Sequence, residues 1–186
     1  MPPVMKRSPW ALLLLASCCS PEPNRTSRDP YERYLGVREL ATARTAVSVA
    51  EAVRLLDDPH PLVVVGALET LADFRDKDFL QHAVPKLKSG PPLVRAQACA
   101  TVATLRNEEG VGPLLEVLKD SDPTVRRAAV KALAGFGGKT EVRRALVETV
   151  GDKDPSVALM AHTKLQEITG RTDVARSKEA WAAAVP

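Results

Sequence analysis

Aromatic residues and β-strand patterns are scarce in this chain. Aromatics make up 4% of its 186 residues, whereas 45% are hydrophobic, with many Ala, Leu and Val. No segment keeps the strict alternation of apolar and polar residues that marks a half-buried strand. The chain is long enough to bury a real core, so we expect one soluble domain of the all-α class.

The chain also lacks a large excess of charge of one sign. It has 26 basic and 23 acidic residues. Lys6 and Arg7 lie in an N-terminal leader without an acidic residue, so the remainder is nearly neutral. Nucleic-acid binding requires concentrated positive charge, because much of its free energy comes from counterion release. The composition therefore predicts no nucleic-acid partner.

Patterns of catalytic and metal-binding residues are missing as well. The histidines His60, His82 and His162 include no pair at the i, i+4 spacing of a helical metal site, and there is no glycine-rich phosphate loop. Three cysteines do not make a disulfide framework, and Cys99, among small residues of a helical pattern, is expected to be buried. We predict no catalytic residues, no metal and no cofactor.

The apolar run Trp10–Ala16 is too short to span a bilayer but has the length of a secretory signal core. The tetrad LASC that ends at Cys18 resembles the bacterial lipobox, which implies cleavage after residue 17 and lipidation of Cys18. A plain cleavage site and a transmembrane stub are the alternatives. We expect a lipoprotein-type signal peptide at 1–17 and a membrane anchor facing the periplasm. Cys19 is not the Asp of the known inner-membrane signal, which leaves the outer membrane open.

The segment 18–29 follows this leader. It contains Pro, Ser and Asn and shows no apolar period. A segment of this composition cannot bury enough apolar surface to fold alone, and its mean span is about 20 Å. We predict a flexible tether between Cys18 and the folded domain.

The dominant feature of the remaining chain is a repeat. Equivalent prolines occur at Pro61, Pro92, Pro123 and Pro155, spaced by 31, 31 and 32 residues. Four apolar columns follow these prolines at +2, +6, +10 and +13: Val63, Val94, Val125, Val157; Ala67, Ala98, Ala129, Ala161; Leu71, Val102, Leu133, Leu165; and Phe74, Leu105, Phe136, Ile168. These offsets fall on one side of a helix, so each proline begins a helix with one buried face.

Each of these helices is preceded by another apolar segment. The segments are Val47–Leu56, Phe79–Leu87, Val111–Leu118 and Val142–Val150. Each unit is therefore a helical hairpin, which cannot bury its apolar face alone and gains a core by stacking on its neighbours. The alanine column lets the helices of adjacent units approach closely.

Both ends of the array carry a weaker form of the pattern. The phase extends back to Pro30, so Pro30–Ala43 is predicted to be an N-terminal capping helix, with Glu32 in place of the column valine. The segment 171–186 is a C-terminal cap or tail. Ser177 can cap a last short helix anchored by Trp181, and a frayed tail fits equally well.

The third unit reads D-x-D-P-x-V-R-x-x-A-x-x-A-L, which resembles the HEAT-like repeat of the type named after phycobilin lyases. The resemblance covers nearly all of residues 30–170. It implies a short α-solenoid of about four hairpins whose second helices line a concave face. It also implies a ladder of Asp–Arg hydrogen bonds, here Asp122 with Arg126 and with Arg95 joining from its neighbour. The ladder is incomplete, because Val64 and an alanine replace the arginine in the first and fourth units.

Arg127 and Lys131 face away from the apolar columns, where stacking does not require them. With Arg95 they form a candidate basic patch for an acidic protein or peptide, and Glu69 and Asp73 at related positions of the first unit would give the face a polarity. A solvated helix face is the alternative. We expect a membrane-anchored scaffold or adaptor of the bacterial cell envelope. The alternative function is a lyase-like or small-ligand-binding protein associated with an enzyme.

Overall fold

The computed structural model describes residues 26–185, which form ten α-helices and contain no strand. The all-α prediction is confirmed for this part of the chain. The predicted signal peptide 1–17, the lipidation site Cys18 and most of the tether 18–29 lie outside the described residues. None of the described helices is long and apolar enough to cross a membrane.

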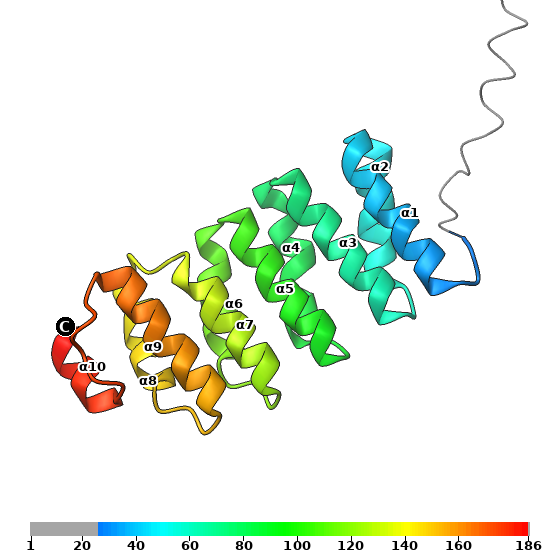
Figure 1. Ribbon diagram of the computed structural model, residues 1–186. Helices are drawn as coiled ribbons and strands as arrows, with labels where there is room; N and C mark the ends of the chain where they lie inside the picture. The colour runs from blue at the N-terminus through cyan, green and yellow to red at the C-terminus, as the bar shows by residue number, and fades with distance from the viewer. Residues whose placement is uncertain (1–25, 186) are drawn as a thin grey trace, which may run out of the picture.

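The helices form two layers (Figure 1). The front layer holds the five long helices α1 (Pro30–Ala43), α3 (Pro61–Phe74), α5 (Pro92–Leu105), α7 (Pro123–Ala134) and α9 (Pro155–Thr169). The layer behind holds the shorter helices α2 (Ala46–Arg54), α4 (Leu80–Ala83), α6 (Val111–Val117) and α8 (Thr140–Thr149). Each long helix packs on the next one, so the predicted α-solenoid is confirmed.

The apolar columns form the core. The column alanines are all 0% exposed, and the column valines are at most 3% exposed. A methyl group at each crossing lets the backbones of adjacent long helices approach. The outward positions behave differently, since Arg127 and Lys131 are exposed. The assignment of buried and open faces from the helical period is therefore confirmed.

The helix α1 closes the N-terminal end with the bounds that the repeat phase predicts. Asp29 accepts a hydrogen bond of 2.9 Å from the backbone N–H of Tyr31 and caps the helix. The ring of Tyr34 lies over Gly66 of α3, where a Cβ atom would come within 2.7 Å of the Tyr34 ring. Glycine is thus required at position 66 for the close approach of α1 and α3.

One predicted helix is shorter than its apolar segment suggests. In the segment 79–87 only Leu80–Ala83 is α-helical, and the 3₁₀ turns Lys77–Phe79 and Val84–Lys88 flank it. Pro85 explains the change, because it has no N–H for the i→i−4 hydrogen bond and its ring clashes with the preceding turn.

The C-terminal segment ends in α10 (Lys178–Ala184), which packs on α8. Ser177 Oγ accepts a hydrogen bond of 3.1 Å from the backbone N–H of Ala180 and so caps this helix. The side chain of Trp181 is 0% exposed, and its Nε1–H donates a hydrogen bond of 2.8 Å to His162 Nδ1 on α9. Of the two alternatives left open by the sequence, the structure has the capping helix.

Candidate interaction face

Arg126 lies in an ion pair that joins two repeat units. Its guanidinium donates two hydrogen bonds of 2.8 Å to the carboxylate of Asp152, and its Nη1 donates to the backbone carbonyls of Asp120 and Ser121. The Arg126 side chain is only 4% exposed. This arrangement holds α7 against the loop that leads into α9, so Arg126 has a structural role.

The predicted pairing of Asp122 with Arg126 is wrong. Asp122 is the N-cap of α7, and its Oδ1 accepts a hydrogen bond of 2.7 Å from the backbone N–H of Thr124. That cap turns the carboxylate toward its own helix. The acid of the ladder is instead the first aspartate of the D-x-D-P motif in the following unit, which is Asp152 for Arg126.

The same rule describes the other rungs of the ladder. Arg95 donates hydrogen bonds of 2.7 and 2.9 Å to Asp120, and Arg33 donates two of 3.0 Å to Asp58. In each pair, an arginine three residues after one proline meets an aspartate three residues before the next. The sequence reasoning missed these aspartates, although their fixed distance from the prolines is visible in the sequence.

These contacts keep both members of each pair charged. The hydrogen bond from Arg95 lowers the pKa of Asp120 against the opposing effect of burial. At Asp152, burial is the largest single influence and raises the pKa, but the hydrogen bond and charge of Arg126 and the hydrogen bond from the backbone N–H of Asp154 together outweigh it, so the net shift is downward. The hydrogen bond to Asp152 in turn raises the pKa of Arg126. The ladder is therefore fully ionised at neutral pH.

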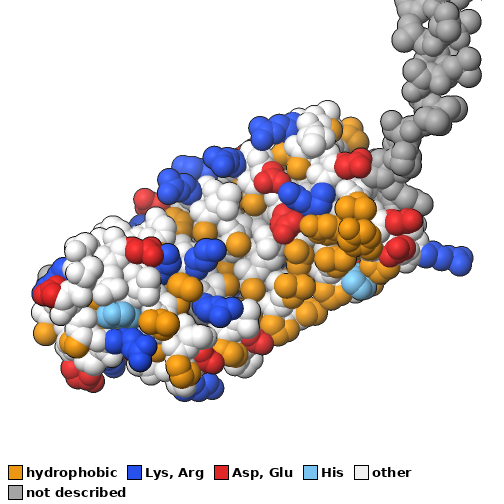
Figure 2. All heavy atoms as spheres, in the orientation of Figure 1, with side chains coloured by type: hydrophobic (Ala, Val, Ile, Leu, Met, Phe, Trp, Pro, Cys, Tyr) orange, Lys and Arg blue, Asp and Glu red, His pale blue; other side chains and the backbone are white. Residues whose placement is uncertain are grey.

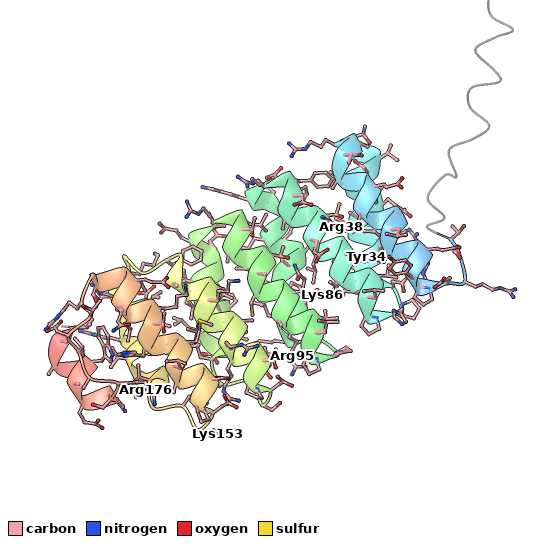
Figure 3. All side chains as sticks on the ribbon, viewed as in Figure 1. Tyr34, Arg38, Lys86, Arg95, Lys153 and Arg176 are labelled. Carbon is pink, nitrogen blue, oxygen red and sulfur yellow. The ribbon has the colours of Figure 1, made fainter. Side chains whose placement is uncertain are left out.

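Arg95 consequently differs from the other two residues of the predicted basic patch. Figure 3 shows it at the lower end of α5, and its side chain is only 15% exposed because it is paired with Asp120. Arg127 and Lys131 are exposed on α7 and form no ion pair within residues 26–185. The structure thus separates Arg95, a member of the ladder, from two exposed cations without an ion-pair partner in the described part of the chain.

Arg127 and Lys131 belong to a larger surface, which we call the long-helix face. It consists of the side chains at +1, +4 and +8 from each proline, all of them at least partly exposed except Val65, which is 8% exposed: Tyr31, Tyr34, Arg38; Leu62, Val65, Glu69; Leu93, Ala96, Ala100; Thr124, Arg127, Lys131; and Ser156, Leu159, Thr163. Figure 2 views this face. Hydrophobic side chains gather over α1, α3 and α5, and Lys and Arg side chains lie toward α7.

The acidic end that the sequence suggested for this face is partly neutralised. Arg38 of α1 lies 3.4 Å from a carboxylate oxygen of Glu69 and 2.9 Å from one of Asp73. Figure 3 shows Tyr34 and Arg38 on α1, and the Tyr34 hydroxyl also lies 3.4 Å from Glu69. Two carboxylates share one cation here, so this end keeps a net negative charge, and the unpaired cations on α7 add positive charge further along the face.

Next to the cations lies an apolar strip across three long helices. We define it by the +1 side chains Tyr31, Leu62 and Leu93 and the +4 side chains Tyr34 and Ala96, whereas the +4 residue of α3, Val65, is buried. Tyr31 is 58% exposed and Leu93 is 57% exposed. The sequence reasoning missed this strip. Its signal is the residue directly after each proline, which is apolar in α1, α3 and α5 and polar in α7 and α9.

The shorter helices carry a different feature, a cleft of about 490 Å³ beside α4 and α6. Lys77, Asp78, Asn107 and Glu109 contribute polar groups to its rim. No group of three or more His, Cys, Asp or Glu residues within 26–185 could hold a metal ion. Cys99 is buried in α5, and burial raises the pKa of its thiol to about 12, so it is not a ready nucleophile.

Comparisons with known proteins agree with this geometry. The family described as HEAT repeats matches residues 80–166. CpcE and CpcF, solved as a complex of phycocyanin lyase from Nostoc sp. PCC7120, include a chain that aligns with a TM-score of 0.64 and 19% identity, over 73% of this chain and 90% of that chain.

Designed repeat proteins are similar as well. A designed armadillo repeat protein in complex with the peptide (KR)4 aligns with a TM-score of 0.53 and 18% identity, over 90% of this chain and 100% of that chain. Another designed armadillo repeat protein gives 0.52 and 18% over 86% and 94% of the two chains. At such identities the likeness concerns the fold. No curated protein matches the chain. The chain thus has the repeats and the fold of a HEAT-repeat solenoid.

Proposed function

We propose that this HEAT-repeat protein is a non-enzymatic scaffold of a bacterial cell envelope, anchored through lipidated Cys18 and facing the periplasm. It holds a protein or peptide partner, acidic where it meets α7, on the long-helix face. The observation that carries the proposal is the pair Arg127 and Lys131, which are exposed and have no ion-pair partner within residues 26–185. Such side chains add nothing to stacking and are available to a partner.

The solved structures of similar fold support a binding role. One is a complex of two proteins, CpcE and CpcF, and another holds a peptide, (KR)4. The peptide in that complex is basic, whereas the free cations on α7 favour an acidic partner here. The leader and the lipobox-like tetrad support the anchor, since two or three acyl chains on one residue give lasting attachment.

A photo-crosslinking experiment tests the scaffold. A photoreactive amino acid replaces Ala100, which is exposed on the long-helix face, or Glu116, which is exposed on α6 in the other layer. We expect crosslinks to a partner in envelope membranes from position 100 and none from position 116. The Arg127→Glu/Lys131→Glu variant should lose the crosslink while its melting temperature stays unchanged. Crosslinks only from position 116 would place the binding surface on the shorter helices.

The anchor has its own test. Cys18→Ala should leave the leader uncut or release the protein into the soluble periplasmic fraction, because no described helix can hold a bilayer. Fractionation of the cell envelope and detection by antibody measure the outcome. A cleaved Cys18→Ala protein that stays in the membrane would contradict the lipid anchor.

The alternative function is a lyase-like or small-ligand-binding activity, and the likeness to a chain of a phycocyanin lyase complex favours it. It would use the cleft beside α4 and α6, where Lys77 and Glu109 supply titratable groups. Under this alternative, a Lys77→Ala/Glu109→Ala variant loses its function and the Arg127→Glu/Lys131→Glu variant keeps it. The scaffold proposal predicts the reverse order.

A further inference from the structure

The +1 side chains of the apolar strip on α1, α3 and α5 are not a requirement of the fold. Its +1 residues Tyr31 and Leu93 are more than half exposed. The equivalent residues of α7 and α9 are the polar Thr124 and Ser156, which are exposed as well. Because stacked units of the same array fold with polar residues at this position, the apolar ones serve something outside the stack.

The strip and the free cations are neighbours. Helix α5, which carries Leu93 and Ala96, packs directly on α7, which carries Arg127 and Lys131. Hydrophobic side chains therefore line one part of the long-helix face, and unpaired positive charges line the next part (Figure 2). A partner that covers both parts must be apolar at one end of its contact and acidic at the other.

The spacing of the long helices sets the period of such a partner. Packed helices lie about 8–10 Å apart, and an extended chain rises about 3.3 Å per residue. A segment that crosses the helices therefore advances about three residues from one helix to the next. Three helices carry the strip, and the fourth carries the cations.

We propose that the long-helix face binds an extended peptide segment that has apolar side chains about every third residue over α1, α3 and α5, and one or two carboxylates about three residues further on, at Arg127 and Lys131. This inference rests on the proposed scaffold function and names its partner class. The acidic end of the peptide belongs at α7, because the single cation Arg38 is already engaged by the two carboxylates Glu69 and Asp73, which keep the other end of the strip net negative.

The test is a selection from random peptides of about twelve residues, long enough to cross four helices. The full chain in detergent micelles is the target, and affinities of the selected peptides are measured by fluorescence polarisation. We expect the selected sequences to share apolar residues at intervals of about three, followed by Asp or Glu. The reversed order of the two chemistries should be rare among them.

Three variants sharpen the test. Arg127→Glu/Lys131→Glu should weaken the selected peptides at least tenfold, and this loss should shrink in high salt. Leu93→Asp, on a largely exposed side chain, should also weaken them at least tenfold. The matched control is Arg144→Glu/Lys153→Glu, which makes the same charge change at exposed positions away from the long-helix face. The affinity of this control variant for the selected peptides should stay within twofold of that of the unsubstituted protein.

Each other outcome overturns the inference in a recognisable way. If the selected peptides lack carboxylates, or bind the double reversal equally well, the partner chemistry is wrong, although the scaffold function stands. If no peptide binds while crosslinks from position 100 still form, the partner is a folded surface and only this inference fails. A dimer that Leu93→Asp dissociates would make a second copy the occupant. Binding to phosphatidylcholine vesicles that Leu93→Asp abolishes would make it a lipid surface.

Discussion

Two neighbouring junctions of the solenoid are held together in different ways. Between α5 and α7, Arg95 and Asp120 form a largely buried ion pair, and an equivalent pair joins α7 to α9. Between α3 and α5, the same two positions are occupied by Val64 and Ser89. Both partners are missing together, so the junction contains no unpaired buried charge. The comparison shows that the ladder is a pairwise device of each junction, since loss of one partner alone would be costly.

The junction between α3 and α5 has little polar support besides one buried hydrogen bond of 3.1 Å, which Thr101 Oγ1 donates to the backbone carbonyl of Leu68. The N-cap residue of α5 is Pro91, which makes no side-chain cap, whereas Asp122 caps α7. The ion pair between Lys86 and Asp57 lies at this junction, but the Asp57 side chain is 86% exposed and such pairs contribute little. Apolar packing and the Thr101 hydrogen bond therefore carry this junction without a buried ion pair, and we expect it to be the weakest point of the array.

The largest expected effect comes from breaking a rung. Arg126→Met leaves the carboxylate of Asp152 without its partner in a mostly buried place and should cost about 3 kcal/mol of stability. Val64→Met is the matched control at the junction without a pair, and it should cost less than about 1.5 kcal/mol. Urea unfolding followed by circular dichroism measures both. Equal losses would mean that the ladder adds no stability beyond side-chain packing.

An arginine–aspartate pair introduced at the junction between α3 and α5 should show a favourable coupling energy between the two new residues. Val64→Arg alone buries a cation without a partner and should cost about 2 kcal/mol. The double variant Val64→Arg/Ser89→Asp should recover at least about 1 kcal/mol of that loss, because the new pair has the same spacing as Arg95 and Asp120. A double-mutant cycle in urea measures the coupling energy. Strict additivity would show that the backbone at this junction does not allow the pair.

Low pH should destabilise the junctions that contain an arginine–aspartate pair. The pKa values of Asp58, Asp120 and Asp152 are lowered in the folded state. Their stabilisation is complete above the unfolded pKa of about 4 and is lost as the pH falls through the lower folded values. The melting temperature should therefore drop steeply below about pH 4, and less steeply in Arg126→Met, which keeps one rung fewer. If the melting temperatures of the two proteins fell by the same amount from neutral to acidic pH, Asp152 would not be a source of the acid sensitivity.

The smallest expected effect concerns the missing cap of α5. Pro91 has the extended backbone of an N-cap residue, φ −66° and ψ 147°, but no acceptor side chain. Pro91→Asp supplies the acceptor, which contributes about 1 kcal/mol, and loses about 0.5 kcal/mol through greater freedom of the unfolded chain. The free energy of unfolding of Pro91→Asp should thus be about 1 kcal/mol higher than that of Pro91→Ala, as measured by thermal unfolding. If the two variants melt together, residue 91 does not act as a cap.

Much of the fold can be predicted from the sequence, because the same helical pattern occurs several times along the chain. One helix with Val, Ala and Leu at fixed offsets is ambiguous, but four copies in phase identify the buried face, and the bounds of α1 follow from Pro30. The cap at Asp122 was also predictable, since a short acceptor before proline fits the free N–H groups of a helix start. The split around Pro85 could have been read from that proline alone.

The partners of the arginines were harder to predict. The partner of Arg126 lies in the next unit, and choosing between Asp122 and Asp152 requires the register of one unit on another. Two features of the sequence bear on this choice: the fixed distance of the aspartates from the prolines, and the joint replacement at Val64 and Ser89. The grouping of Arg95 with the free cations was wrong for the same reason, since its acid also lies beyond its own helix.

The buried indole of Trp181 gives the molecule a local optical reporter. Trp181 is the only tryptophan within residues 26–185, and it packs at the C-terminal end, three junctions away from α3. Its fluorescence therefore follows the last units, whereas far-ultraviolet circular dichroism follows every helix. An array that parts first between α3 and α5 loses helical signal before its emission shifts to the red. The lag between the two curves measures how far cooperativity extends along the stack.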